Sequence, residues 1–179
     1  MTAFAQAYSR TPATLSEAGY PMGLGIPANT FTGLLLMSAI VFAIFISISG
    51  LYADKIGRRK WLIWTTVSIL IFALCMPLFL GNGTPTSVFA FLVIGMALMG
   101  MTFGPMAALL PELFPTEVRY SGASLAYNIA SIIGATIAAM ISLKINALYG
   151  LMGVGIYLAI NAFLTLSLIH ISEPTRLDV

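Results

Sequence analysis

Charged side chains are rare in this chain of 179 residues, and most of them gather in two short blocks. The first block runs from Gly50 to Lys60 (GLYADKIGRRK) and holds five of the fourteen acidic and basic side chains. The second runs from Pro111 to Arg119 (PELFPTEVR) and holds three more. Guanidinium and carboxylate groups placed in this way predict ion pairs between the blocks.

The residue types predict a contact that can break and form again. Arg58 or Arg59 could form a bidentate ion pair with Glu112 or Glu117, and Asp54 could accept backbone N–H groups from the start of a neighbouring helix. Glycines in the first block permit close helix approach and a tight turn. Half-exposed ion pairs stabilise weakly, which suits a reversible contact. A simpler interpretation is a loop anchored only by its positive charge. The candidate residues of the contact are Gly50, Asp54, Gly57, Arg58, Arg59, Glu112, Glu117 and Arg119.

Membrane-spanning helices are the elements that must position these blocks. Hydrophobic residues make up 59% of the chain and charged residues 8%, which is more apolar surface than one soluble core could hide. A helix needs about 20 apolar residues to cross the hydrocarbon core, and continuous apolar runs favour helices over strands. The predicted fold class is an all-α, polytopic helical bundle. Its spans are expected at residues 30–52, 61–80, 88–110, 120–143 and, truncated, 152–165.

Loop charges predict the orientation of these spans. Loops 54–60 and 111–119 would be cytoplasmic and would carry five Lys and Arg residues, against two in the external loops 9–29, 81–87 and 144–151. Tyr52, Trp61 and Trp64 flank the first block and are expected to anchor it at the level of the lipid headgroups.

Small residues predict how two of the spans pack. Gly100 and Gly104 form a GxxxG pair in the third span, and Pro105 beside them predicts a bend. The fourth span has a small residue at every fourth position, which predicts tight packing inside the bundle. These positions are Gly122, Ala126, Ala130, Gly134 and Ala138.

The sequence contains no pattern typical of an enzyme or a metal site. Cys75 is the only cysteine, so no CxxC pair or Cys/His cluster exists, and neither a cofactor nor a metal is expected. The net charge of +2 is accounted for by the predicted cytoplasmic loops and gives no reason to expect nucleic acid as a partner. No Asp, Glu, Lys or Arg lies deep in a predicted span, so no proton carrier is evident.

The two blocks resemble motifs of a known family. The first matches the signature loop of the major facilitator superfamily, G-x-x-x-D-[RK]-x-G-[RK]-[RK]-[RK]. Residues 111–128 (PELFPTEVRYSGASLAYN) are similar to a run typical of its metabolite:proton symporters. The resemblance covers residues 1–165 and implies the C-terminal half of a twelve-helix transporter. Residues 1–8 would be the end of family helix seven, 9–29 an external loop and 30–165 the C-terminal transmembrane bundle.

The resemblance implies proton-coupled symport of a small organic acid or zwitterionic metabolite by alternating access in a bacterial inner membrane. The expected partners are the substrate, protons, the lipid bilayer and the N-terminal half of the same transporter. A sugar-porter-like member, or a structural or nonfunctional membrane fragment, is the alternative. Candidate substrate contacts could equally be interhelical polar contacts. They are Gln6, Tyr8, Phe103, Tyr127 and Asn128.

The end of the chain resembles no protein family. Residues 166–176 (LSLIHISEPTR) are similar to the translated adapter of transposase-based DNA sequencing libraries, so residues 166–179 are expected to be a non-native tail. His170, the only histidine, would belong to that tail. A genuine short amphipathic terminus is the alternative.

Overall fold

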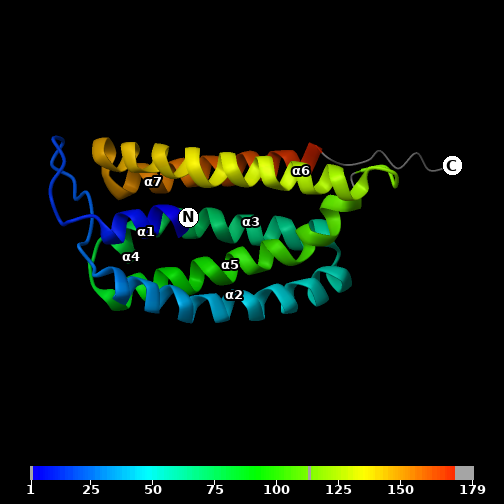
Figure 1. Cartoon of the computed structure of the whole chain (residues 1–179), viewed down its shortest axis with the longest axis horizontal. Helices are drawn as coiled ribbons and strands as arrows, with labels where there is room; N and C mark the ends of the chain where they lie inside the picture. The colour runs from blue at the N-terminus through cyan, green and yellow to red at the C-terminus, as the bar shows by residue number, and fades with distance from the viewer. Residues whose placement is uncertain (1, 113, 172–179) are drawn as a thin grey trace.

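The computed structural model describes residues 2–112 and 114–171, which form a bundle of helices (Figure 1). Within these residues there is no β-strand, and Leu15 and Pro21 form an isolated bridge. The predicted all-α fold class is therefore confirmed. In chain order the elements are α1 (Thr2–Arg10), α2 (Ala28–Ile56), α3 (Arg58–Leu74), α4 (Met76–Leu80), α5 (Pro85–Glu112), α6 (Arg119–Ile132), the π-helix η1 (Ile133–Ile137) and α7 (Ala138–Ile171).

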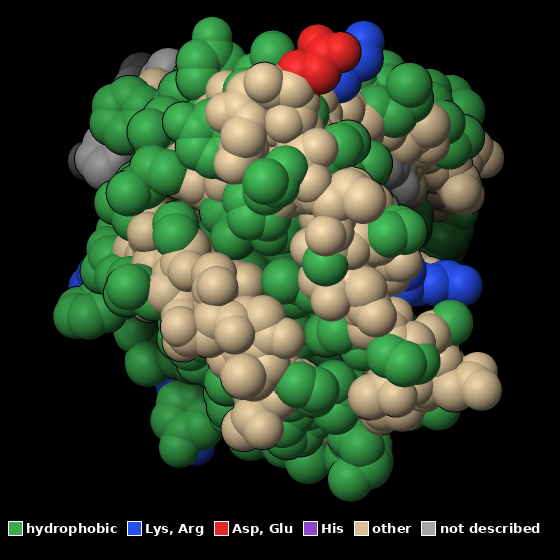
Figure 2. All heavy atoms as spheres, turned by 90° about the vertical axis from the view of Figure 1, so that its left-hand side faces the viewer, with side chains coloured by type: hydrophobic (Ala, Val, Ile, Leu, Met, Phe, Trp, Pro, Cys, Tyr) green, Lys and Arg blue, Asp and Glu red, His purple; other side chains and the backbone are tan. Residues whose placement is uncertain are grey.

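The helices run between two ends of the bundle, as Figure 1 shows. α2 and α5 run in one direction, and α3 and α6 return in the other. The turn at Gly57 and the connection between α5 and α6 lie at one end, which we call the charged end because both charged blocks meet there. Residues 11–27, the turn at 81–84 and the reversal within α7 lie at the other end, which we call the loop end. Figure 2 shows the loop end, where charged side chains are few.

Three of the described helices are long and apolar enough to cross a membrane, namely Ala28–Ile56, Pro85–Glu112 and the α7 residues Ala138–Ile169. α2 has 29 residues and α5 has 28, whereas a span needs about 20. Both helices extend beyond the ranges predicted for them. They therefore carry the charged blocks past the apolar part of the bundle.

The run predicted as one span at 61–80 is divided into two helices. α3 ends at Leu74 and α4 begins at Met76, with Cys75 between them. Pro77 has no backbone N–H, so it cannot continue the hydrogen-bond ladder across this point. One face of α3 and α4 is exposed and apolar, and its most exposed side chain is that of Trp64, at 75%. A membrane span at 61–80 therefore stays a prediction. In the structure this range is formed by two successive helices, α3 and α4.

The loop predicted at residues 144–151 is wrong. α6, η1 and the first part of α7 follow one another without a gap up to Tyr149, and the chain reverses at Gly150 alone (Figure 1). Gly150 has φ 69° and ψ −170°, a conformation that residues with a Cβ rarely adopt. Its Cβ position is also blocked by the ring of Tyr20, at 2.6 Å. Asn146 donates a 2.9 Å hydrogen bond to the Pro21 carbonyl, so the loop of residues 11–27 covers this reversal.

An apolar core fills the half of the bundle nearer the loop end. Its centre includes the stacked rings of Phe72 and Phe91, whose centroids are 5.0 Å apart. Phe4 and Tyr8 bring α1 into the same core, where each is at most 2% exposed.

The two predictions about small residues have different outcomes. Gly100 and Gly104 of α5 do pack closely on α2: a Cβ at Gly100 would lie 2.8 Å from the Phe42 carbonyl oxygen, and one at Gly104 2.8 Å from the Gly50 nitrogen. The tight packing predicted for the fourth span stays a prediction, since within the described residues α6 has no buried residue. Its small-residue stripe is covered in part: the ring of Phe114 lies against Gly122, and Ala126 and Ala138 are half-buried, whereas Ala130 and Gly134 are exposed.

Candidate functional site

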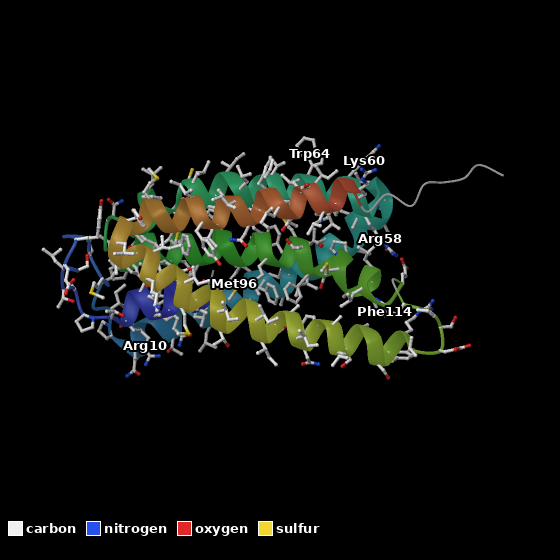
Figure 3. All side chains as sticks on the ribbon, turned by 90° about the horizontal axis from the view of Figure 1, so that it is seen from above. Arg10, Arg58, Lys60, Trp64, Met96 and Phe114 are labelled. Atoms are coloured by element: carbon white, nitrogen blue, oxygen red, sulfur yellow. The ribbon has the colours of Figure 1, made fainter. Side chains whose placement is uncertain are left out.

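The turn at Gly57 places the first charged block at the charged end. α2 ends at Ile56 and α3 begins at Arg58, so one residue reverses the chain. Gly57 has φ 100° and ψ 124°, which a residue with a Cβ would adopt only under strain. The reversal brings the end of α2 and the first turn of α3 next to each other. Figure 3 shows Arg58 at this end of the molecule, with Lys60 and Trp64 farther along α3.

Arg58 connects three helices through its guanidinium group. Its Nε donates a 3.1 Å hydrogen bond to Asp54 Oδ1 on α2, and its Nη1 donates to both carboxylate oxygens of Glu112 on α5, each at 2.9 Å. We call these three side chains the Arg58 bridge. Of the pairings considered from the sequence, the structure contains Arg58 with Glu112. The pair lacks the two parallel hydrogen bonds of a bidentate arginine–carboxylate pair, because Nη1 of Arg58 alone donates to both oxygens of Glu112.

The Arg58 bridge is open to water. The side chains of Arg58, Asp54 and Glu112 are 32%, 67% and 57% exposed. Water and salt compete for such pairs, so they hold the helices only weakly. The bridge can therefore open at little cost.

The Arg58 guanidinium stays charged in this setting. Its hydrogen bond to Glu112, and then that to Asp54, raise the pKa of Arg58 above its ordinary value. A basic group whose pKa is raised on folding stabilises the folded protein. This stabilisation is fully present at a pH below the pKa of the unfolded state, and it is lost as the pH rises through the pKa of the folded state. Because arginine already titrates far above neutral pH, this loss lies outside the physiological range.

Asp54 belongs to the bridge, whereas Glu117, Arg119 and Gly50 lie outside it. Asp54 accepts the Arg58 side chain, and the start of α3 has no side-chain cap, so the expected backbone contact of Asp54 is replaced. Glu117 is exposed and forms no ion pair within the described residues. Arg119 begins α6, and its buried Nε has no hydrogen-bond partner among the described residues. A Cβ at Gly50 would meet nothing within 4 Å, so the glycines that permit close approach are those of α5.

Trp61 has a contact that the sequence analysis missed. It was expected to be a headgroup anchor, yet its Nε1 donates a 3.0 Å hydrogen bond inward to the Met101 carbonyl of α5. The buried Ser49 of α2 donates to the same oxygen at 2.9 Å. Pro105 was the available signal, because a proline leaves the carbonyl four residues earlier without its helical donor.

A cavity of about 510 Å³ lies between α5 and α6, near the charged end. Phe103 and Tyr127, both predicted as substrate contacts, line it and meet edge to face with ring centroids 6.5 Å apart. Phe42 of α2 also meets Phe103 edge to face, with ring centroids 5.6 Å apart. The remaining lining is mostly apolar, with the hydroxyl groups of Thr102 and Ser131.

The other predicted substrate contacts lie elsewhere. Asn128 is next to Tyr127 in sequence, but its side-chain amide donates to the Ser124 carbonyl of its own helix at 2.8 Å. Tyr8 is 1% exposed and stacks on Phe4 in the core. Gln6 is exposed on α1 and does not line the cavity. Within the described residues no group of three or more His, Cys, Asp or Glu side chains could hold a metal ion.

Comparison with known proteins gives consistent matches. The profile of the Major Facilitator Superfamily matches residues 1–178. A protein of Haemophilus influenzae named as a metabolite transport protein is 81% identical over 176 residues, which are 98% of this chain and 40% of that protein. The inner membrane metabolite transport protein YhjE of Escherichia coli is 52% identical over 165 residues, 91% of this chain and 37% of its relative.

A more distant match has a more specific name. The proline/betaine transporter of Salmonella typhimurium is 31% identical over 138 residues, which are 75% of this chain and 27% of that protein. No solved structure matches the chain. The chain thus spans about two fifths of the length of the first relatives it matches.

Proposed function

Because the chain belongs to the Major Facilitator Superfamily, we propose that it is part of a secondary active transporter that moves a small metabolite by alternating access. It is a multi-pass protein of the bacterial inner membrane. The observation that carries the proposal is the Arg58 bridge, a weak and water-exposed contact that joins three helices at one end of the bundle.

The Arg58 bridge acts as one part of a cytoplasmic gate. When the transporter opens to the cytoplasm, helices at the charged end must separate, and contacts between them must break. A buried ion pair would resist this, whereas the exposed bridge can exchange its partners for water. Glu117 and Arg119, which belong to the same block but stand outside the bridge, are then available to the rest of the transporter.

The transported molecule is a small organic acid or a zwitterion, taken up together with protons. The aromatic edge of the cavity, made by Phe103 and Tyr127, suits the apolar or cationic part of such a molecule. The named substrates of the proline/betaine transporter relative are zwitterions, which favours the same class. The described part of the cavity has no charged group to hold a carboxylate, so that group and the proton carrier come from the remainder of the protein.

The remainder of the transporter is the partner of the exposed face of α6. Side chains such as Leu125, Ile129 and Ile132 are between 49% and 67% exposed there. In the complete transporter this face and the cavity beside it would be covered by the N-terminal half. The relatives, which extend well beyond the matched region, support this proposal.

Uptake by the full-length transporter in proteoliposomes tests the function. The panel comprises glycine betaine, proline, small carboxylates and hexoses, each with and without an inward proton gradient. We expect uptake of a zwitterion or a carboxylate that rises with the gradient. Hexose uptake would favour a sugar-porter-like protein, and uptake independent of the gradient would rule out proton coupling.

A further inference from the structure

One backbone carbonyl ties together the three helices that meet at the Arg58 bridge. The Met101 carbonyl of α5 accepts a 2.9 Å hydrogen bond from Ser49 Oγ of α2 and a 3.0 Å hydrogen bond from Trp61 Nε1 of α3. Ser49 is fully buried. We call these three residues the Met101 clamp.

Pro105 explains why this carbonyl is available. In a regular helix the Met101 oxygen would accept from the backbone N–H of residue 105, but proline has none. Pro105 is buried, and the carbonyl lies in a partly buried setting among apolar helices. An unsatisfied backbone oxygen in apolar surroundings is costly. The two side-chain donors therefore meet a demand that the proline creates.

The helix packing around the clamp keeps both donors in place. Gly100 and Gly104 lie on either side of Met101 in the sequence, and their missing side chains let α2 approach close enough for the short Ser49 side chain to reach α5. On the other side, the Trp61 ring stacks on Tyr52 of α2, with centroids 6.0 Å apart and planes 22° apart. This stacking fixes the orientation of the indole N–H.

The clamp and the bridge involve the same three helices. α2 carries Ser49 and Asp54, α3 carries Trp61 and Arg58, and α5 carries Met101 and Glu112. Trp61 follows Arg58 by three residues, which is less than one helical turn. A shift of α3 relative to α5 at the clamp therefore moves the guanidinium group relative to its carboxylates.

We infer that Ser49 and Trp61 are positioning residues for the gate: through the Met101 carbonyl they hold α2 and α3 against α5, so that Arg58 meets Asp54 and Glu112 in register. The inference rests on the proposed gate for its functional meaning. The clamp itself is observable without transport. It contributes partly buried, directional bonds where the bridge contributes only exposed ones.

The experiment measures the separation of α3 and α5 at the charged end. Spin labels are attached to cysteines introduced at Lys60 and Ala108 in the full-length, membrane-inserted transporter, with its other cysteines replaced. Ser49→Ala and Trp61→Phe each remove one donor of the clamp. Ser47→Ala and Trp64→Phe are the matched controls, because Ser47 bonds only within its own helix and Trp64 is largely exposed.

We expect the double variant Ser49→Ala with Trp61→Phe to raise the population in which α3 and α5 are separated. The rise should be about threefold to tenfold, as the loss of the one hydrogen bond between α3 and α5 predicts. The control variants should keep the parental distances. Pro105→Ala should also raise the separated population. The alanine adds a backbone N–H that competes with Ser49 and Trp61 for the Met101 oxygen, which has only two lone pairs. Parental distances in the double variant would overturn the clamp.

A coupling measurement separates positioning from a general loss of packing. If Ser49 positions the bridge, then Ser49→Ala and Glu112→Gln will be less than additive in their effect on the separated population. Two independent structural effects would add, and additivity would overturn the positioning role. The gate has its own test in the same data, because parental distances in Glu112→Gln alone would count against the gate while leaving the clamp measurement intact.

Discussion

At the scale of single residues, Arg58 is distinguished from its neighbours by how many helices it joins. It pairs with Asp54 four residues earlier and with Glu112 fifty-four residues later. The signature spacing predicts that arginines and carboxylates meet, but not which of them. Arg58 and Arg59 point in directions about 100° apart on a helix. The choice of partner therefore depends on how α3 is rotated against α5, and a single sequence does not contain that information.

Removal of either side of the bridge is expected to slow transport. Asp54→Asn and Arg58→Ala in the full-length protein should each reduce the initial rate of substrate uptake several-fold, because the gate loses a contact that stabilises its closed state. Membrane insertion should be unchanged, since the bridge is exposed. The amount of protein in isolated membranes measures insertion, and uptake is normalised to it.

Lys60→Ala provides the control for charge. It removes a positive charge from the same loop, and Lys60 forms no ion pair within the described residues. Its uptake should remain near the parental rate. Parental rates for both Asp54→Asn and Arg58→Ala would show that the bridge has no part in gating.

At the scale of elements, the contact of α2 with α5 follows from two glycines. Gly100 and Gly104 are readable from the sequence as a GxxxG pair, and the structure confirms their close contact. The same reading has no counterpart within the described residues for the stripe on α6, although its spacing is as regular. Small residues permit a close approach, but a second helix must be present to make it. Among the described residues, α5 contacts α6 at Tyr127, but it leaves no residue of α6 buried.

Gly104→Ala is expected to destabilise this contact by about 1–3 kcal/mol, the usual cost of overpacking. The new methyl group would lie 2.8 Å from the Gly50 nitrogen and 2.9 Å from the Ile46 carbonyl oxygen, and backbone atoms cannot move aside easily. Thermal unfolding of the purified protein in detergent measures the change.

Gly33→Ala is the matched substitution for Gly104→Ala. Gly33 lies within α2, and a Cβ there would meet nothing within 4 Å. Its replacement should stabilise the helix by about 0.5–1 kcal/mol through backbone entropy alone. Equal changes in the two variants would show that the close approach at Gly104 does not matter for stability.

The limits of helices were harder to predict than their presence. Continuous apolar runs predicted α2 and α5 well, because hydropathy reports burial in lipid. They did not predict the break at Cys75, which depends on Pro77, nor the reversal at Gly150, which depends on one backbone conformation and on the cover given by Tyr20. Residues 172–179 of the predicted tail lie outside the described part of the chain, and the origin of that tail stays a prediction.

At the scale of the whole molecule, charge distinguishes the two ends of the bundle. The positive-inside rule predicts that the charged end faces the cytoplasm. Single cysteines test this in a Cys75→Ala background. A cysteine at Lys60 should react with a membrane-impermeant maleimide only in inside-out vesicles. One at Glu17, in the loop of residues 11–27, should react in intact spheroplasts.

The Cys75→Ala protein without an added cysteine controls for background labelling. The labelling pattern reports orientation alone and is independent of transport. The opposite pattern, with Lys60 labelled from outside, would invert the topology and remove the cytoplasmic gate from the proposal.

The hydrogen bond from Asn146 to Pro21 and the ring of Tyr20 over Gly150 have a consequence for the solvent. These contacts hold the loop end with uncharged groups, whereas at the charged end the exposed charges of the Arg58 bridge act beside the neutral hydrogen bonds of the Met101 clamp. Ionic strength screens charges and hardly affects neutral hydrogen bonds or ring packing. Dissolved salt therefore acts on this bundle from one side only: it loosens the end that carries the Arg58 bridge and leaves the reversal at Gly150 as tight as before.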